Sequence, residues 1–252
     1  MKRFPIYSVI LLMLLLFLWD LAARSMSELV LPTPIVIFHT LFEGIIGGYF
    51  TPHIIRTTSE VLLGLFFGGV FGFVAGIILG EVPFLRKLLF PYIIASQAVP
   101  KLALAPLFIL WFGFGMTSKV VITALICFFP LLENTVMAIK YTDKQKQELF
   151  KMLGASRWQT LIHLKIPAGM PGIIAGLRVA VVLAIVGAVV GEFIGGSDGL
   201  GAVIIASQGM MDTPLMFATL ILLTAMGMGL YQAVQLLEKK WVKRFIKETE
   251  KK

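Results

Sequence analysis

The stretch "KQELFKMLGASRWQTLIHLKIPAGMPG", residues 146–172, gathers charged residues, helix-capping residues and turn residues in a chain that is otherwise very apolar. Apolar segments lie on both sides of it. Each is long enough to cross a hydrocarbon core of roughly 30 Å as a helix. The stretch therefore predicts a small polar module held between two membrane spans.

The composition of the whole chain is that of an integral membrane protein. Of 252 residues, 58% are hydrophobic and 14% are charged, and the mean hydropathy is +0.91. We expect an all-α fold with about six transmembrane helices, at residues 6–23, 53–79, 88–111, 120–138, 169–190 and 215–236. The first span follows two basic residues but is long and lacks a clean cleavage site, which favours a retained anchor over a secretory signal.

The distribution of Lys and Arg predicts the orientation of these spans, because positively charged loops are retained in the cytoplasm. With the N-terminus inside, the cytoplasmic segments near 1–5, 81–87, 139–168 and 237–252 contain 17 of the 22 basic residues. Both termini are therefore expected in the cytoplasm. The net charge of +8 is then explained by topology and an anionic membrane surface, and indicates no nucleic-acid partner.

The local chemistry of the segment between spans four and five predicts two short helices. Thr142 with Gln145, and Ser156 with Gln159, fit capping boxes that open them. Gly154 lies where a left-handed C-terminal cap is needed. Two prolines mark the entry to the fifth span: Pro167 and Pro171. An ordinary amphipathic connection is the alternative, but it does not require two caps and a shaped turn.

Several motifs in and around this segment resemble one family. Residues 148–159, "ELFKMLGASRWQ", with Ile166-Pro167 and "PGIIAGLR" at 171–178, are similar to the EAA loop of ABC-importer permeases. The motifs "FFPLLENTVMAIKYTD", "GEFIGGSDGLGAVI" and "PKLALAPLFILWFGFG" resemble the branch that includes sulfonate, taurine, nitrate and thiamine-precursor permeases. One departure is that Leu149 and Phe150 replace the two alanines that name the motif.

This resemblance implies a single transmembrane permease domain, 1–252, of type I ABC-importer architecture, with a cytoplasmic coupling loop at about 139–168. It implies two ABC ATPase subunits, a second permease subunit that is a copy or a close homologue, and an external solute-binding protein. ATP and Mg would bind the ATPase, because the chain has no Walker-type phosphate loop. The chain itself is expected to bind no cofactor or metal, to perform no catalysis, and to lie in a prokaryotic inner membrane.

The resemblance also implies roles in the coupling loop. Glu148 and Arg157 would be rim charges, and Gly154 would form the turn. The remaining contact residues would be Leu153, Ala155, Trp158 and Pro167. For Trp158 an anchor at the membrane interface is an equally good interpretation.

Two stripes of small residues predict close helix packing. In the second span they are Gly64, Gly68, Gly72, Gly76 and Gly80, and in the fifth Ala168, Gly172, Gly176, Ala180, Ala184 and Ala188. Small residues at a four-residue spacing let helix backbones approach where lipid gives no hydrophobic drive. We expect spans two and five to cross in close contact.

Polar residues inside spans indicate a substrate pathway. Ser96, Gln97 and Lys101 flank Pro100 in the third span, where Pro100 and Pro106 should interrupt the helix. Glu133 is a further candidate. The alternatives are that Lys101 reaches to the membrane surface, that Glu133 pairs with Arg178 as a structural ion pair, and that Glu192 is solvated in an external loop.

We therefore expect the permease subunit of an ATP-driven importer that translocates a small organic or inorganic anion or a vitamin precursor. A secondary transporter or a channel without an ATPase is the alternative, but the internal repeat typical of many transporters is not evident. An intramembrane enzyme is disfavoured because the three histidines are dispersed. Residues 34–50 are expected to lie along the outer surface.

Overall fold

A computed structural model describes the backbone of residues 6–249 and the side chains of residues 6–239, and every regular element in it is helical. In chain order the elements are α1 (Ile6–Arg24), α2 (Pro34–Ile46), α3 (Phe50–Glu81), α4 (Pro83–Gln97), the 3₁₀ helix η1 (Lys101–Leu104), α5 (Ala105–Phe112), α6 (Met116–Lys140), α7 (Lys144–Met152), α8 (Arg157–Thr160), the π-helix η2 (Leu161–Lys165), α9 (Ile166–Gly195), α10 (Leu200–Gly209) and α11 (Thr213–Thr249).

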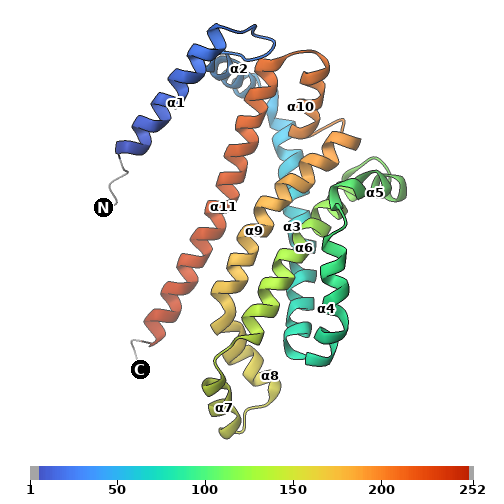
Figure 1. Ribbon diagram of the computed structural model, residues 1–252, viewed down its shortest axis with the longest axis vertical. Coiled ribbons are helices and arrows are strands. Elements are labelled where there is room, and N and C mark those ends of the chain that lie inside the picture. The colour runs from blue at the N-terminus through green and yellow to red at the C-terminus, as the bar shows by residue number, and fades with distance from the viewer. Residues whose placement is uncertain (1–5, 250–252) are drawn as a thin grey trace.

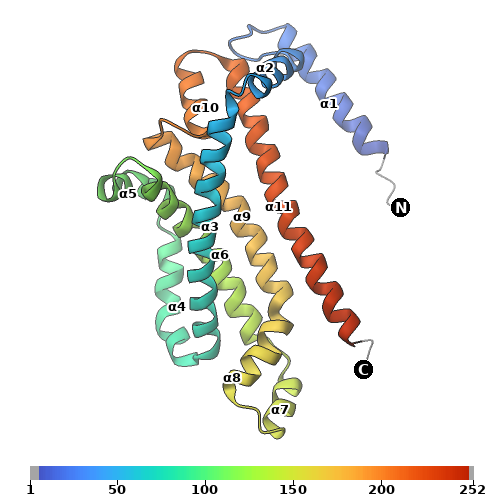
Figure 2. The ribbon, with the colours of Figure 1, turned by 180° about the vertical axis from the view of Figure 1, so that it is seen from behind.

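The arrangement of these helices agrees with six membrane crossings. Five helices of the described chain are long and apolar enough to cross a membrane, and the number is six when the bent pair formed by α4 and the segment 101–112 is counted as one span. The short helices α7 and α8 lie at one end of the bundle, whereas α2 and α10 lie at the other (Figures 1 and 2). With α7 and α8 in the cytoplasm, α11 returns to the cytoplasmic side.

The third crossing is broken, with an angle of 81° between its two parts. Helix α4 ends at Gln97, and Pro100 precedes η1 in an extended conformation. A proline removes a backbone donor and obstructs the preceding turn, so the helix axis changes direction there. Pro106 does not interrupt the chain, because it lies in the first turn of α5, where a missing N–H group has no helical partner to lose.

Helix α6 lies between α3 and α9 and forms the centre of the bundle (Figure 1). The glycines of α3 face α6: a Cβ atom at each would meet Thr123 (from Gly64), Ala124 (from Gly68), Phe128 (from Gly72), Thr135 (from Gly76) and Ile139 (from Gly80). On the other side, a Cβ atom at Gly176 or Gly172 of α9 would meet Asn134 or Ala138 of α6.

Spans two and five do touch, as expected from the stripes, and Ala180, Ala184 and Ala188 of span five form one buried cluster with Val61 of span two and Cys127 of span four. The glycines of both stripes, however, face span four rather than each other. The periodicity of a stripe shows that a backbone approaches closely, and it carries no information about which helix approaches.

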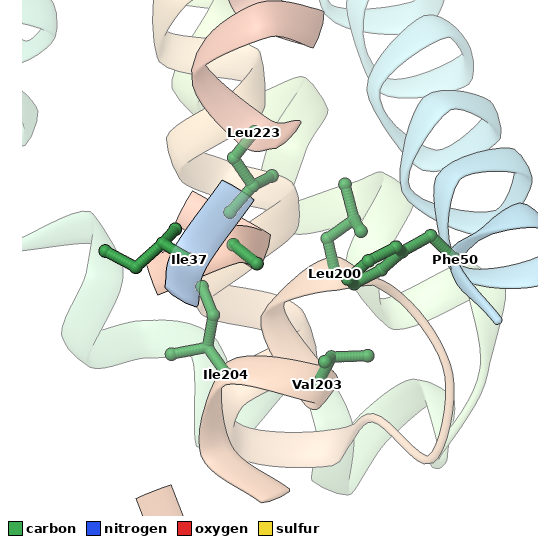
Figure 3. Packing of buried hydrophobic residues seen from close by; sticks show 7 residues of the cluster. Ile37, Phe50, Leu200, Val203, Ile204 and Leu223 are labelled. Atoms are coloured by element: carbon green, nitrogen blue, oxygen red, sulfur yellow. The ribbon is translucent and has the colours of Figure 1, made fainter. Parts of the chain in front are cut away.

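The outer end of the bundle has its own hydrophobic core. Side chains from α2, α3, α10 and α11 meet there (Figure 3), namely Ile37, Phe50, Leu200, Val203, Ile204, Ala218 and Leu223. Helix α2 crosses this end of the bundle (Figure 1). The core fixes the short external helices on the ends of the spans.

Candidate functional site

The polar segment between α6 and α9 forms two short helices, which with the intervening turn we call the coupling module (residues 144–160). Helix α7 is capped by Asp143, whose side chain accepts a hydrogen bond from the backbone of Gln145 at 2.9 Å. The predicted cap at Thr142 was wrong by one residue. The Thr142 hydroxyl is buried and instead donates to carbonyl groups in the last turn of α6.

The turn between the two helices is formed as predicted. Gly154 has φ +73°, and the amides of Gly154 and Ala155 bond back to Lys151 and Phe150 in the last turn of α7. This is a Schellman termination, which requires a left-handed residue. Ser156 and Gln159 form a complete capping box that opens α8.

Helix α8 continues into the fifth span without a break. The π-helix η2 joins α8 to α9, so that residues Arg157–Gly195 form one continuous helical segment. Pro167 is half-buried and lies directly after the π-helical turn inside this continuous segment. Just beyond the module, the ammonium group of Lys165 contacts Glu81 at the end of α3. The module is therefore joined by the chain to α6 and α9, and its base is linked to α3.

The module has an apolar surface that the rest of the chain leaves uncovered. Leu153 and Trp158 are 74% and 68% exposed, far more than large apolar side chains generally are in a packed connection. Beside them, Glu148, Ala155 and Arg157 line a polar pocket of about 510 Å³ that also includes Glu81 and Lys165. The structure thus brings together all the predicted coupling residues of the loop itself, as an exposed patch beside a charged recess.

A second site lies within the membrane region. Gln97, Lys101 and Glu133 line a cavity of about 390 Å³ between the break in the third span, α6 and α9. The amide of Gln97 donates to the carboxylate of Glu133, and the Lys101 ammonium lies 3.9 Å from the centre of the Phe129 ring. The cavity therefore contains side chains from both sides of the break at Pro100.

Two sequence-based interpretations of this region do not hold. Glu133 does not pair with Arg178, because it bonds Gln97 while Arg178 forms an ion pair with Glu238 near the end of α11. The guanidinium reaches α11 because α9 packs against that helix. Ser96 does not line the cavity, since its exposed hydroxyl donates to the carbonyl of Ile93 within its own helix.

A third polar cluster, at the outer end, was not expected from the sequence. The sequence assigned Glu192 no role, with solvation in an external loop as one alternative, yet its side chain is 1% exposed and accepts hydrogen bonds from Thr57 and from the amide of Gly201. Nearby, the carboxylate of Glu60 pairs with Arg56 and Lys119. Three polar side chains spaced along one face of an apolar span, at 53, 57 and 60, were the signal that could have indicated it.

The fold and these sites define a class of protein: a polytopic helical membrane subunit with a compact polar module at one end of the bundle. The chain belongs to the family described as binding-protein-dependent transport system inner membrane component, which it matches over residues 68–243.

Curated relatives span almost the whole chain. The riboflavin transport system permease protein of Chloroflexus aurantiacus is 38% identical, over 90% of this chain and 86% of the relative. The formylaminopyrimidine transport permease protein of Halalkalibacterium halodurans is 34% identical, over 90% of each chain. The putative aliphatic sulfonates transport permease protein of Bacillus subtilis is 32% identical, over 86% of this chain and 79% of the relative.

A solved structure has the same fold. The MetNI methionine ABC transporter, in an inward-facing conformation, aligns with a TM-score of 0.64 at 17% identity, over 76% of this chain and 94% of the solved chain. The chain is thus the permease of a binding-protein-dependent ABC importer for small solutes, a multi-pass inner membrane protein. It acts with ATPase and binding-protein partners, and as a permease subunit it does not itself hydrolyse ATP.

Proposed function

We propose that this permease works as a pair with a second permease subunit and two ATPase subunits, and that its coupling module docks into a groove on one ATPase. The observation that carries the proposal is the exposed apolar pair Leu153 and Trp158 on a module with both helix ends capped. A rigid apolar projection costs little conformational entropy when it is bound, which suits a contact that must transmit force.

The attachments of the module supply the path for that force. Closure of the ATPases around ATP would displace α7 and α8. The continuous helix through η2 would carry the displacement into α9, and the contact of Lys165 with Glu81 would carry it to the end of α3. Movement of two spans that both pack on α6 is a means of closing the inner mouth while opening the outer one.

We further propose that the cavity at Gln97, Lys101 and Glu133 lies on the substrate pathway. Among the described residues Lys101 is in no ion pair, and it faces an aromatic ring. A cationic donor in a region of low dielectric gains most from an anionic group on the substrate. The cavity also offers the amide of Asn134 and the carboxylate of Glu133, which suit a polar heterocycle.

These features favour a small organic solute that carries an anionic group or a polar ring, such as a vitamin precursor or a sulfonate. The names of the relatives, which refer to riboflavin, formylaminopyrimidine and aliphatic sulfonates, lie within this range.

The test is reconstitution of the permease with its cognate ATPase and binding protein in liposomes. ATP inside and the loaded binding protein outside should together drive uptake of the solute that the binding protein retains. Uptake that proceeds without the ATPase would contradict the proposal and indicate a secondary transporter or a channel.

A further inference from the structure

The N-terminus of the external helix α10 is capped entirely by side chains from two membrane spans. The amide of Gly199 donates to Nδ1 of His53 at 3.2 Å, and the amide of Leu200 donates to Oγ1 of Thr57 at 2.8 Å. The amide of Gly201 donates to Oε2 of Glu192 at 2.6 Å. His53 and Thr57 belong to α3 and Glu192 belongs to α9, so α10 joins these two spans.

The capping side chains are themselves joined. The Thr57 hydroxyl donates to Oε1 of Glu192 at 2.6 Å. Lys119 of α6 donates to the backbone carbonyl of Asp198 at 3.3 Å and pairs with Glu60 of α3 at 3.1 Å. Three spans therefore converge on the turn that precedes α10.

The sequence of this turn is adapted to the carboxylate. Gly199 has φ +114°, and a Cβ atom there would collide with the Glu192 carboxyl group. A Cβ atom at Gly201 would lie 2.7 Å from Oε2 of Glu192. The glycines of "GGSDGLG" thus allow a buried carboxyl group to reach the N-terminus of a helix, where a hydrogen bond from a backbone amide is strong because water is excluded.

We propose that Glu192, Thr57 and His53 form an outer latch: positioning residues that hold α10 over the outer end of the bundle and release it when the importer opens outward. The latch bonds α10 to α3 and α9 at their outer ends; at the inner end α9 continues directly from the coupling module, and α3 contacts the base of α9 through the pair of Glu81 and Lys165. If α3 and α9 move apart, α10 cannot keep its bonds to both.

The closed position is also stabilised by packing. Leu200 and Val203 of α10 are buried against Phe50 of α3 in the outer core (Figure 3). An apolar contact alone is not directional and permits sliding. The hydrogen bonds donated by the three backbone amides give the closed position a definite geometry. They can all be lost in one step when α10 is released.

The first test is hydrogen exchange on the assembled permease–ATPase complex with its binding protein, followed in peptides that cover residues 196–205. In the nucleotide-free complex the amides at 199–201 should be protected. In the vanadate-trapped complex they should exchange roughly tenfold faster or more, as expected for opening of a local unit. Equal protection in both states would overturn the latch.

The second test uses variants that leave the fold largely in place. Glu192→Gln and Thr57→Val should each raise ATP hydrolysis in the absence of binding protein by about threefold or more, because an unlatched outer end no longer opposes the outward state. The double variant should add little to either single variant. Glu43→Gln, at an exposed carboxylate on the same side of the molecule, is the matched control and should behave as wild type.

A purely structural role predicts a different result: a lower thermal midpoint for both variants with unchanged dependence of ATP hydrolysis on the binding protein. That result would also overturn the proposal. The inference rests on the proposed ATP-driven cycle, so the wild-type complex must first show uptake. Its failure to do so would contradict the proposed function, whereas an active complex with an unchanging turn at 199–201 would contradict the latch alone.

Discussion

The ammonium group of Lys165 lies 2.6 Å from a carboxylate oxygen of Glu81, which joins the base of the fifth span to the end of the second. The two side chains are 84 positions apart in the sequence and mostly buried, with 16% and 21% of each exposed. The pair is the one ion pair between α3 and the segment that carries the coupling module among the described residues.

We expect this ion pair to contribute to coupling. Lys165→Met should reduce ATP-driven uptake severalfold while assembly is retained, and the exchanged pair Glu81→Lys with Lys165→Glu should recover part of it. A coupling energy on the order of 1 kcal/mol is typical of a partly exposed pair. A double-mutant cycle on uptake rates measures this coupling energy. If the effects of the two single variants simply add in the double variant, the contact plays no part in coupling.

The left-handed turn at Gly154 gives a second prediction. No atom lies within 4 Å of a Cβ built at Gly154, so a substitution is opposed by backbone strain alone, roughly 1–2 kcal/mol for a non-glycine residue. Gly154→Val should leave insertion intact and lower uptake by about tenfold. Gly154→Asn, which tolerates positive φ, should be much milder. Normal uptake by the Val variant at normal expression would refute the role of the turn.

Trp158 distinguishes docking from anchoring. If it contacts the ATPase, Trp158→Ala should weaken the free energy of binding to the ATPase by about 2 kcal/mol, which is typical of a buried interface tryptophan. Less ATPase should then copurify with the variant. If it only anchors the module at the membrane surface, the ATPase should remain bound. Tyr141→Ala, at an equally exposed aromatic residue just outside the module, serves as the control.

The glycine stripe of α3 predicts sensitivity to added volume. A Cβ atom at Gly72 would lie 2.5 Å from the Phe128 carbonyl oxygen of α6, so Gly72→Leu should separate the two helices and reduce the yield of folded permease several-fold. Gly229→Leu in α11, where no atom lies near the added Cβ, should be tolerated. An unchanged thermal midpoint for the Gly72 variant would contradict the packing seen here.

Lys101 carries the prediction on substrate. Lys101→Met should raise the solute concentration for half-maximal uptake by about tenfold or more and leave basal ATP hydrolysis unchanged, because the lost group would bind cargo rather than the ATPase. Liposome uptake measured against solute concentration provides the measurement. An unchanged curve would remove Lys101 from the pathway and with it the argument for an anionic group on the cargo.

The coupling module could be predicted almost entirely from the sequence, because its determinants are local. A left-handed glycine and a capping box depend on a few neighbouring residues, so the roles of Gly154 and of the Ser156–Gln159 pair can be predicted from the local sequence. The one error, Thr142 in place of Asp143, reflects two adjacent residues that can both serve as caps. The interruption near Pro100 could be predicted for the same reason, because proline acts on the adjacent turn of the helix.

What the sequence by itself determined was the class of fold, the six crossings, their orientation and the polar module, since hydropathy, charge distribution and caps depend on short segments of chain. Only the tertiary structure decided that the glycines of both stripes face α6, that Arg178 pairs with Glu238, and that Glu192 caps α10. These depend on the relative rotation and neighbours of helices. In lipid many helix pairs offer similar apolar surfaces, and the choice among them is made by close packing and by polar groups finding partners across the assembled bundle.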